Sequence, residues 1–485
     1  MVVTVMLRPL VCRAFVRYQS TAPSWLHSRT VGELVHALQR VEHLDNDELA
    51  LLEDKSQQLL SDDMREASML ALTLHNFGGN AQQLLTRVEV RPDDANIDIF
   101  YRTLAECGVT EPPKSLSDVL DSIEGLENIR QIYNFFCAAC IFKEHGDTLA
   151  FDSLVERLHL VGFTEFSSLQ LLQMASGLAV LSDDNYGSLL ESLCDELSVR
   201  KLMDININDL IDGMSKLSKY YLNEALLKAF EETISLHCTE GLLSPYDICS
   251  VLYIFSRYRK CDSLLMDRLA VMIRRDVGNY DIAQLSRVIL SLSQIGYYNK
   301  PLVALIGRMV LTLIDPEAIL DTQLLTNLYT GFSRFHHHNK LFETFSAILQ
   351  KEEVFAELQV HDAVAIVQSY ARIHTVDERL FRLFDSKLFC KPLNTTLSQK
   401  LLVAHGKLRY NNTRLQNILV NNINLKEIGS TIDREKLKLA AERLGLFFPE
   451  LTDDGEEDAI PRITWRRMVP LRRKLPHVRR RKWTW

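Results

Sequence analysis

The residues best suited to chemistry stand at the C-terminal end of the chain, where arginine and tryptophan are interspersed with proline. The last 24 residues hold ten Lys or Arg and no acid, and three of the four tryptophans lie in the last 21. Arginine offers forked donors to phosphates, and tryptophan offers a flat surface on which unpaired bases stack. Pro461, Pro470 and Pro476 prevent a continuous helix, so we expect an extended segment. The candidate RNA-binding residues are Arg462, Trp465, Arg466, Arg467, Arg472, Arg473, Lys474, Arg479, Arg480, Arg481, Lys482, Trp483 and Trp485.

Other roles also fit this basic tail. It follows a short acidic segment, so it could dock on the acidic body of its own chain or of a neighbouring copy; the acids are Asp453, Asp454, Glu456, Glu457 and Asp458. Because Trp and Arg both favour anionic lipid surfaces, a membrane-surface anchor is a second alternative. A nuclear-localisation run is a third, and the N-terminus argues against it.

The N-terminus reads as an address. Arg8, Arg13, Arg17 and Arg29 are its only charged side chains, and no acid occurs before Glu33. This composition is typical of a mitochondrial presequence, which we expect over residues 1–30, and it predicts import into the matrix. A basic terminus without an address is the alternative. With both basic ends subtracted, residues 33–461 carry a net charge of −22, so the surface of the body should repel nucleic acid outside any local basic patch.

Other residues that could hold a metal or act as a nucleophile form no convincing constellation. Cys137 and Cys140 are the only CxxC pair, and no second pair follows at zinc spacing, so core packing is the better interpretation. His336, His337 and His338 lie in a polar link where histidines are usually solvated. No phosphate-binding loop, zinc-protease or nucleophile-elbow motif occurs. We therefore expect no enzyme, no cofactor and no metal, and no apolar run reaches the roughly 18 residues that would span a bilayer.

The elements that carry these residues are helical repeats. A small residue recurs about every 38 positions, followed in the clearer copies by a Leu eight or nine places on; the series is Cys140, Val180, Ser218, Ser256, Ser293, Ser333, Ala371 and Gly406. We interpret the small residue as the place where paired helices approach closely, with base reading as the alternative. The pattern of each unit predicts two helices. Each helix can bury its apolar stripe only by stacking against neighbouring units, so we expect an all-α solenoid.

The helices within one repeat follow from capping and periodicity. An Asp before each apolar run can cap a first turn, at Asp209, Asp247, Asp281, Asp321 and Asp362. In the repeat that begins at Asp281, the stripe expected to be buried on the first helix is Ile282, Leu285, Ile289 and Leu292. The stripe expected on the second helix is Leu302, Leu305 and Met309.

The expected organisation has four parts. Residues 31–126 form an N-terminal helical or capping region with helices over 33–60 and 64–85. Residues 127–450 form the solenoid, ending in a helix over 433–444. Residues 1–30 are the presequence, and 451–485 are the acidic break and the basic tail.

The repeats resemble the degenerate helical-repeat proteins of mitochondria and plastids, the octotricopeptide and heptatricopeptide class. The residues that carry the resemblance lie at Asp247–Ser256, Asp281–Ser293 and Leu264–Leu269, and it extends over about 127–425. Many members end in an α/β module, the RAP domain, which is missing here, and this puts a nuclease role in doubt. The chain is also similar to the helical-repeat proteins of kinetoplastid-type mitochondria. That resemblance implies a non-catalytic RNA-binding scaffold in RNA processing, guide-RNA-directed editing or mRNA stability, with guide, messenger or ribosomal RNA and other subunits as partners. The alternatives are a mitochondrial ribosome subunit or assembly factor, and a protein-only adaptor.

Overall fold

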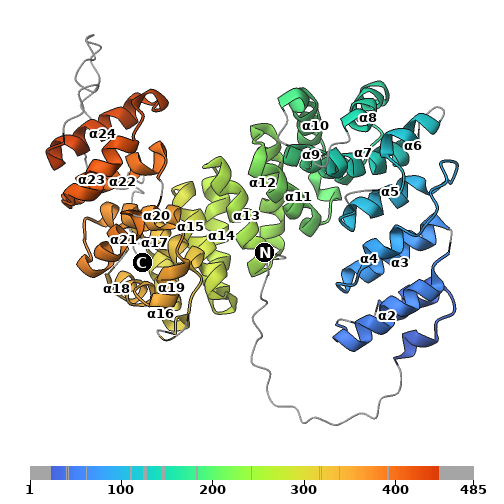
Figure 1. Cartoon of the computed structure of the whole chain (residues 1–485), viewed down its shortest axis with the longest axis horizontal. Helices are drawn as coiled ribbons and strands as arrows, with labels where there is room; N and C mark the ends of the chain where they lie inside the picture. The colour runs from blue at the N-terminus through green and yellow to red at the C-terminus, as the bar shows by residue number, and fades with distance from the viewer. Residues whose placement is uncertain are drawn as a thin grey trace, which may run out of the picture. The chain divides into compact units, whose positions relative to one another are not determined.

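The computed structural model describes residues 23–446, apart from 40, 42, 62, 110–111, 124–127, 144–147, 182–183, 242, 316, 318, 338, 390 and 392. Over these residues it contains 24 α-helices, five short 3-10 helices and no strand (Figure 1). The prediction of an all-α helical-repeat fold is confirmed. None of the helices in this part is both long and apolar enough to cross a bilayer. The chain divides into two compact units between Lys201 and Leu202, and the four-part organisation expected from the sequence stays a prediction.

In the first unit, the described residues form ten α-helices. They are α1 (Val31–Leu38), α2 (Asn46–Leu59), α3 (Met64–Asn76), α4 (Ala81–Leu85), α5 (Ile97–Glu106), α6 (Leu116–Ser122), α7 (Ile129–Lys143), α8 (Thr148–Val161), α9 (Ser168–Leu181) and α10 (Gly187–Val199). Helices α3, α5, α7 and α9 pack against one another in series, and the remaining helices flank this row.

Two helical stretches that the sequence predicts as continuous are each broken in two. The stretch 33–60 divides before Asp45, whose carboxylate accepts a hydrogen bond from the N–H of Glu48 and begins α2 with a capping box. The stretch 64–85 divides at Gly78, whose φ of 84° ends α3. Asn80 then caps α4 by accepting from the N–H of Gln83.

The second unit is a series of helix pairs. The first helix of each pair packs against the first helices of the neighbouring pairs: α11 (Ile207–Tyr220), α13 (Pro245–Tyr258), α15 (Ile282–Ile295), α17 (Thr322–Arg334), α20 (Val360–Ile373), α22 (Thr395–Leu408) and α24 (Thr431–Leu444). Helix α24 confirms the predicted helix over 433–444. The second helices are α12 (Glu224–Glu240), α14 (Ser263–Asp276), α16 (Lys300–Leu313), α18 (Asn339–Leu349), α21 (Glu378–Phe389) and α23 (Thr413–Asn422), and a short helix α19 (Glu352–Glu357) follows α18.

The buried stripes agree with the periodicity in the first helix of a pair and shift in the second. On α15, Leu285, Ile289 and Leu292 are buried as predicted, and Ile282 at the end of the helix is half-buried. On α16, Leu302 is buried as predicted, but Leu305 and Met309 are only half-buried. The second helix instead buries the face one residue further round, with Val303, Ile306 and Val310. Both faces of α16 are apolar, so periodicity could not choose between them.

Candidate functional site

The small residues of the repeat lie where successive first helices meet. Ser218, Ser256, Ser293 and Ser333 are buried. Each hydroxyl donates to the carbonyl of the residue three positions earlier, with an Oγ to O distance of 2.7 Å from Ser256 to Tyr253. A buried hydroxyl that is already bonded to its own helix does not face a base. The base-reading alternative therefore has no support at these positions.

The closest helix contacts also join successive first helices, and not the two helices of one pair. A Cβ placed on Gly406 of α22 would lie 2.6 Å from Cα of Ala440 on α24. A Cβ on Gly331 of α17 would lie 3.0 Å from the carbonyl carbon of Ile289 on α15. Real Cβ atoms essentially never approach backbone as closely as at Gly406, so α22 requires glycine there, whereas a Cβ at Gly331 would require Ile289 to shift.

The predicted capping aspartates take two different positions. Asp281 and Asp321 are N-caps and accept from the N–H groups of Gln284 at 2.7 Å and Gln323 at 3.1 Å. Asp209, Asp247 and Asp362 stand at the third residue of their helices, so the expectation that they are N-caps was wrong. At this place an acid still favours the positive end of the helix. The exposed carboxylates at the N-terminal ends of the first helices form what we term the acidic edge: Asp209, Asp212, Asp281 and Asp321.

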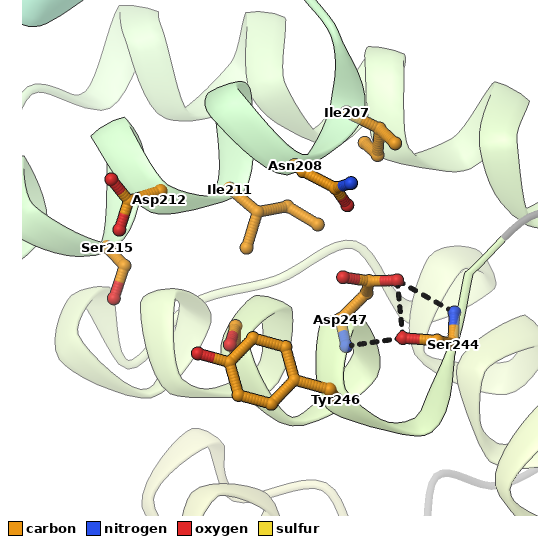
Figure 2. A pocket seen from close by; sticks show the side chains of 9 residues that line it. Ile207, Asn208, Ile211, Asp212, Ser215, Ser244, Tyr246 and Asp247 are labelled. Atoms are coloured by element: carbon orange, nitrogen blue, oxygen red, sulfur yellow. Dashed lines mark hydrogen bonds between the residues drawn. The ribbon is translucent and has the colours of Figure 1, made fainter. Parts of the chain in front are cut away.

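A hollow of 590 Å³ opens in this region of the second unit, between the N-terminal halves of α11 and α13 (Figure 2). Its lining combines two isoleucines, one amide, two carboxylates and four hydroxyl groups: Ile207, Asn208, Ile211, Asp212, Ser215, Ser244, Tyr246, Asp247 and Ser250. Of these residues only Asp247 was singled out from the sequence, and as a cap, because the packing of the two helices brings the others together.

The polar groups of the hollow differ in their freedom to bind. The Asp247 carboxylate is held by the N–H and the hydroxyl of Ser244, at 2.8 and 2.6 Å (Figure 2). Asp212 is exposed, and among the residues that the structure describes it forms an ion pair with Lys216 on its own helix, an interaction that contributes little. Tyr246 is also exposed. An exposed carboxylate and an aromatic ring beside two isoleucines suit the cationic head and aliphatic stem of a Lys or Arg from another protein.

The structure shows what surrounds the cysteines and histidines that were singled out from the sequence. Cys140 is buried against Gly177 on the neighbouring helix α9. Burial raises the pKa of the Cys137 thiol to about 11, which keeps it protonated and unreactive. His337 is half-buried and its ring lies over Gly307 of α16, so it is not solvated as expected, while His336 is exposed and His338 lies outside the described residues. Within the part of the chain that the structure describes, no cluster of three or more His, Cys, Asp or Glu could hold a metal ion.

The basic tail lies outside the described residues, as does the expected presequence up to residue 22. The tail comprises all thirteen candidate RNA-binding residues: Arg462, Trp465, Arg466, Arg467, Arg472, Arg473, Lys474, Arg479, Arg480, Arg481, Lys482, Trp483 and Trp485. Their role stays a prediction.

The stacked helix pairs define the chain as an all-α helical-repeat protein. Residues 259–460 match the family model described as RNA-editing substrate-binding complex 6 protein. The matched stretch begins at the turn after α13 and includes every helix from α14 to α24, which is less than half of the chain. No curated protein matches this chain.

Proposed function

We propose that this chain is a non-catalytic scaffold subunit of an RNA-editing substrate-binding complex in the mitochondrial matrix. The observation that carries the proposal is the match of residues 259–460 to the family of that description. The kinetoplastid-type mitochondrial proteins that the chain resembles work in the same process, and its acid-free N-terminus agrees with import into mitochondria.

The surfaces of the second unit support a scaffold role. A row of helix pairs offers a long surface on which several partners can bind side by side. The acidic edge and the hollow between α11 and α13 would hold basic side chains of other subunits, with Asp212 and Tyr246 as the accessible contacts.

The RNA contact assigned to this subunit is the basic tail. Its ten Lys or Arg would follow phosphates, and its three tryptophans would stack on unpaired bases. With about six to ten phosphate contacts, a plot of log affinity against log salt would have a slope on the order of −4 to −7.

Affinity purification of the tagged full-length chain from mitochondria, with and without RNase, followed by a density gradient, tests the proposal. We expect complexes smaller than ribosomes that contain guide or messenger RNA. Part of the assembly should persist after RNase, because the acidic edge binds protein. Co-migration with ribosomal particles would contradict the proposal in favour of a ribosomal role. An association that contains no RNA would support an adaptor that binds only protein.

A further inference from the structure

The residues with positive φ occupy one place in the repeat. Among the described residues, four that are not glycine have a positive φ: Arg259 (51°), His336 (52°), His374 (55°) and Arg409 (54°). Each stands three residues after a small residue of the repeat, where its first helix ends. Gly296, with φ of 82°, occupies the same place at the end of α15.

The residue types at this place are costly for the backbone. A left-handed conformation is strained for any side chain with a Cβ, and glycine adopts it freely, as Gly296 does. Cations near the end of a helix interact favourably with its dipole. A cation one turn earlier, with an ordinary φ, would interact equally well. Two arginines and two histidines that accept the strain therefore indicate a function for their side chains outside the helix.

A second set of cations stands directly after the small residue, at Lys219, Arg257, Arg334, Arg372 and Lys407. The side chains of the three arginines reach the preceding first helix. Nη2 of Arg257 donates to the carbonyl of Lys219 at 3.1 Å, and Nη1 of Arg334 donates to the carbonyl of Ser293 at 3.3 Å. Nη1 of Arg372 donates to Oγ of Ser333 at 3.2 Å. The C-terminal ends of the first helices therefore lie side by side.

We term the cations at these ends the cationic row: Lys219, Arg257, Arg259, Arg334, Arg372, Lys407 and Arg409. It lies at the opposite ends of the first helices from the acidic edge, so the net charge of −22 on the body conceals a separation of charge between the two edges of the second unit. A sequence total could not reveal it.

Neighbouring cations in the cationic row repel one another. None of the ion pairs among the described residues includes Arg257, Arg259, Arg334, Arg372 or Arg409. Burial, and then the charge of Arg334, lower the pKa of Arg372 to about 10. Burial and the neighbouring cations, Arg372 first among them, lower the pKa of Lys407 to about 8. An anion bound along the row would relieve this repulsion.

Two carboxylates at the starts of the second helices are used by the backbone. Asp262 accepts from the N–H groups of Leu264 and Leu265, at 2.9 and 3.1 Å. Asp377 accepts from the N–H groups of Arg379 and Leu380, at 3.1 and 3.0 Å. Each carboxylate therefore caps the second helix of its pair and does not pair with the cations of the row.

Exposed aromatic rings stand on the same edge. Tyr298, two residues after Gly296, is 43% exposed and packs on Phe335 with ring centroids 5.6 Å apart. Tyr220 is 48% exposed, with Nζ of Lys219 lying 5.6 Å from the centre of its ring. Rings of this kind beside cations are the surface on which single-stranded bases stack.

We propose that the cationic row binds the sugar–phosphate backbone of single-stranded RNA, with Tyr298 and Tyr220 as stacking surfaces. A series of forked donors repeated from one helix to the next suits a chain of phosphates. The exposed rings favour RNA over an acidic peptide, and the choice of RNA also rests on the proposed function. The site is separate from the basic tail, so this chain would contact RNA at two places.

A double variant, Arg259→Gly with Arg409→Gly in the full-length chain, tests the proposal. Glycine removes two charges and the backbone strain together, so we expect the melting temperature to stay unchanged or to rise. Binding of a labelled 20-nucleotide oligouridine should weaken by roughly 25-fold at 0.1 M salt, and the slope of log affinity against log salt should become shallower by about 1.4. A role in stability alone cannot strengthen the fold and weaken RNA binding at once.

The matched control is Lys228→Gln with Lys400→Gln, which removes the same charge from exposed helix positions away from the row. The proposal is overturned if the row variant and the control bind oligouridine with equal affinity and slope, or if the wild type does not bind it. It is also overturned if polyglutamate binds at the row more tightly than oligouridine does. Replacing residues 479–482 with Gln measures the tail separately. A row variant that keeps both its RNA affinity and its place in the complex refutes this site and leaves the proposed function intact.

Discussion

Replacing Gly406 with alanine tests how the last two first helices pack. Alanine in place of glycine inside a helix gains about 1 kcal/mol from the reduced freedom of the unfolded chain and the better helix propensity. At Gly406 the new Cβ would lie 2.6 Å from both Cα and Cβ of Ala440, so α24 must move by about 1 Å, and overpacking of this kind costs about 1–3 kcal/mol. Because the atoms it meets are mainly backbone, no side chain can turn aside. We expect a net loss on the order of 1–2 kcal/mol.

Gly177→Ala provides the matched control. Its Cβ would lie 3.5 Å from Cβ and Sγ of Cys140, which is an ordinary contact. This variant should therefore be more stable by about 0.5–1 kcal/mol. The assay is hydrogen exchange by mass spectrometry, because it reports each helix separately. We expect faster exchange over 431–444 in Gly406→Ala and unchanged or slower exchange over 168–181 in Gly177→Ala. If Gly406→Ala protects 431–444 as well as the wild type does, α22 and α24 do not pack as described.

Three further predictions follow from single side chains. Burial lowers the pKa of His405 from 6.5 to about 4, so the folded protein favours the neutral imidazole. The stabilisation should be fully present above pH 6.5, and the free energy of unfolding should fall by about 3 kcal/mol as the pH drops to 4. In urea titrations at several pH values, His405→Leu should lack this component of the loss. Burial raises the pKa of the Cys194 thiol to about 12. In the native protein this thiol should resist iodoacetamide at pH 8, and it should react after denaturation, as peptide mass spectrometry would show. Rapid labelling of the native protein would contradict its placement in the core. Asp281→Ala removes an N-cap bond and should cost about 1 kcal/mol in urea unfolding, whereas Asp209→Ala at the third helical position should cost less, and the reverse order would refute the capping assignment.

Periodicity and capping predicted much of the helical architecture because both act within one helix. Leu285, Ile289 and Leu292 show this: their spacing alone placed them on a buried face. Periodicity failed at Leu305, because α16 is apolar on two faces and only the neighbouring helix selects one. It failed again at Gly78, where backbone conformation, and not hydrophobicity, ends α3.

The surface of the body could not be predicted in the same way. The net charge favoured a body that repels RNA, which left the tail as the expected contact. The cationic row depends on two facts that the sequence does not state: that the ends of the first helices lie side by side, and that Arg259 and Arg409 have a positive φ. The hollow beside Asp212 likewise exists only because α11 and α13 pack together.

We propose that this chain is a subunit that brings RNA into an editing complex. Ultraviolet crosslinking of the tagged full-length chain in living cells, followed by sequencing of the attached RNA, tests it most directly. We predict enrichment of guide RNAs and of messenger RNAs that undergo editing, with crosslinked peptides from the tail and from the cationic row. Crosslinks confined to ribosomal RNA, or no RNA above an untagged control, would contradict the account.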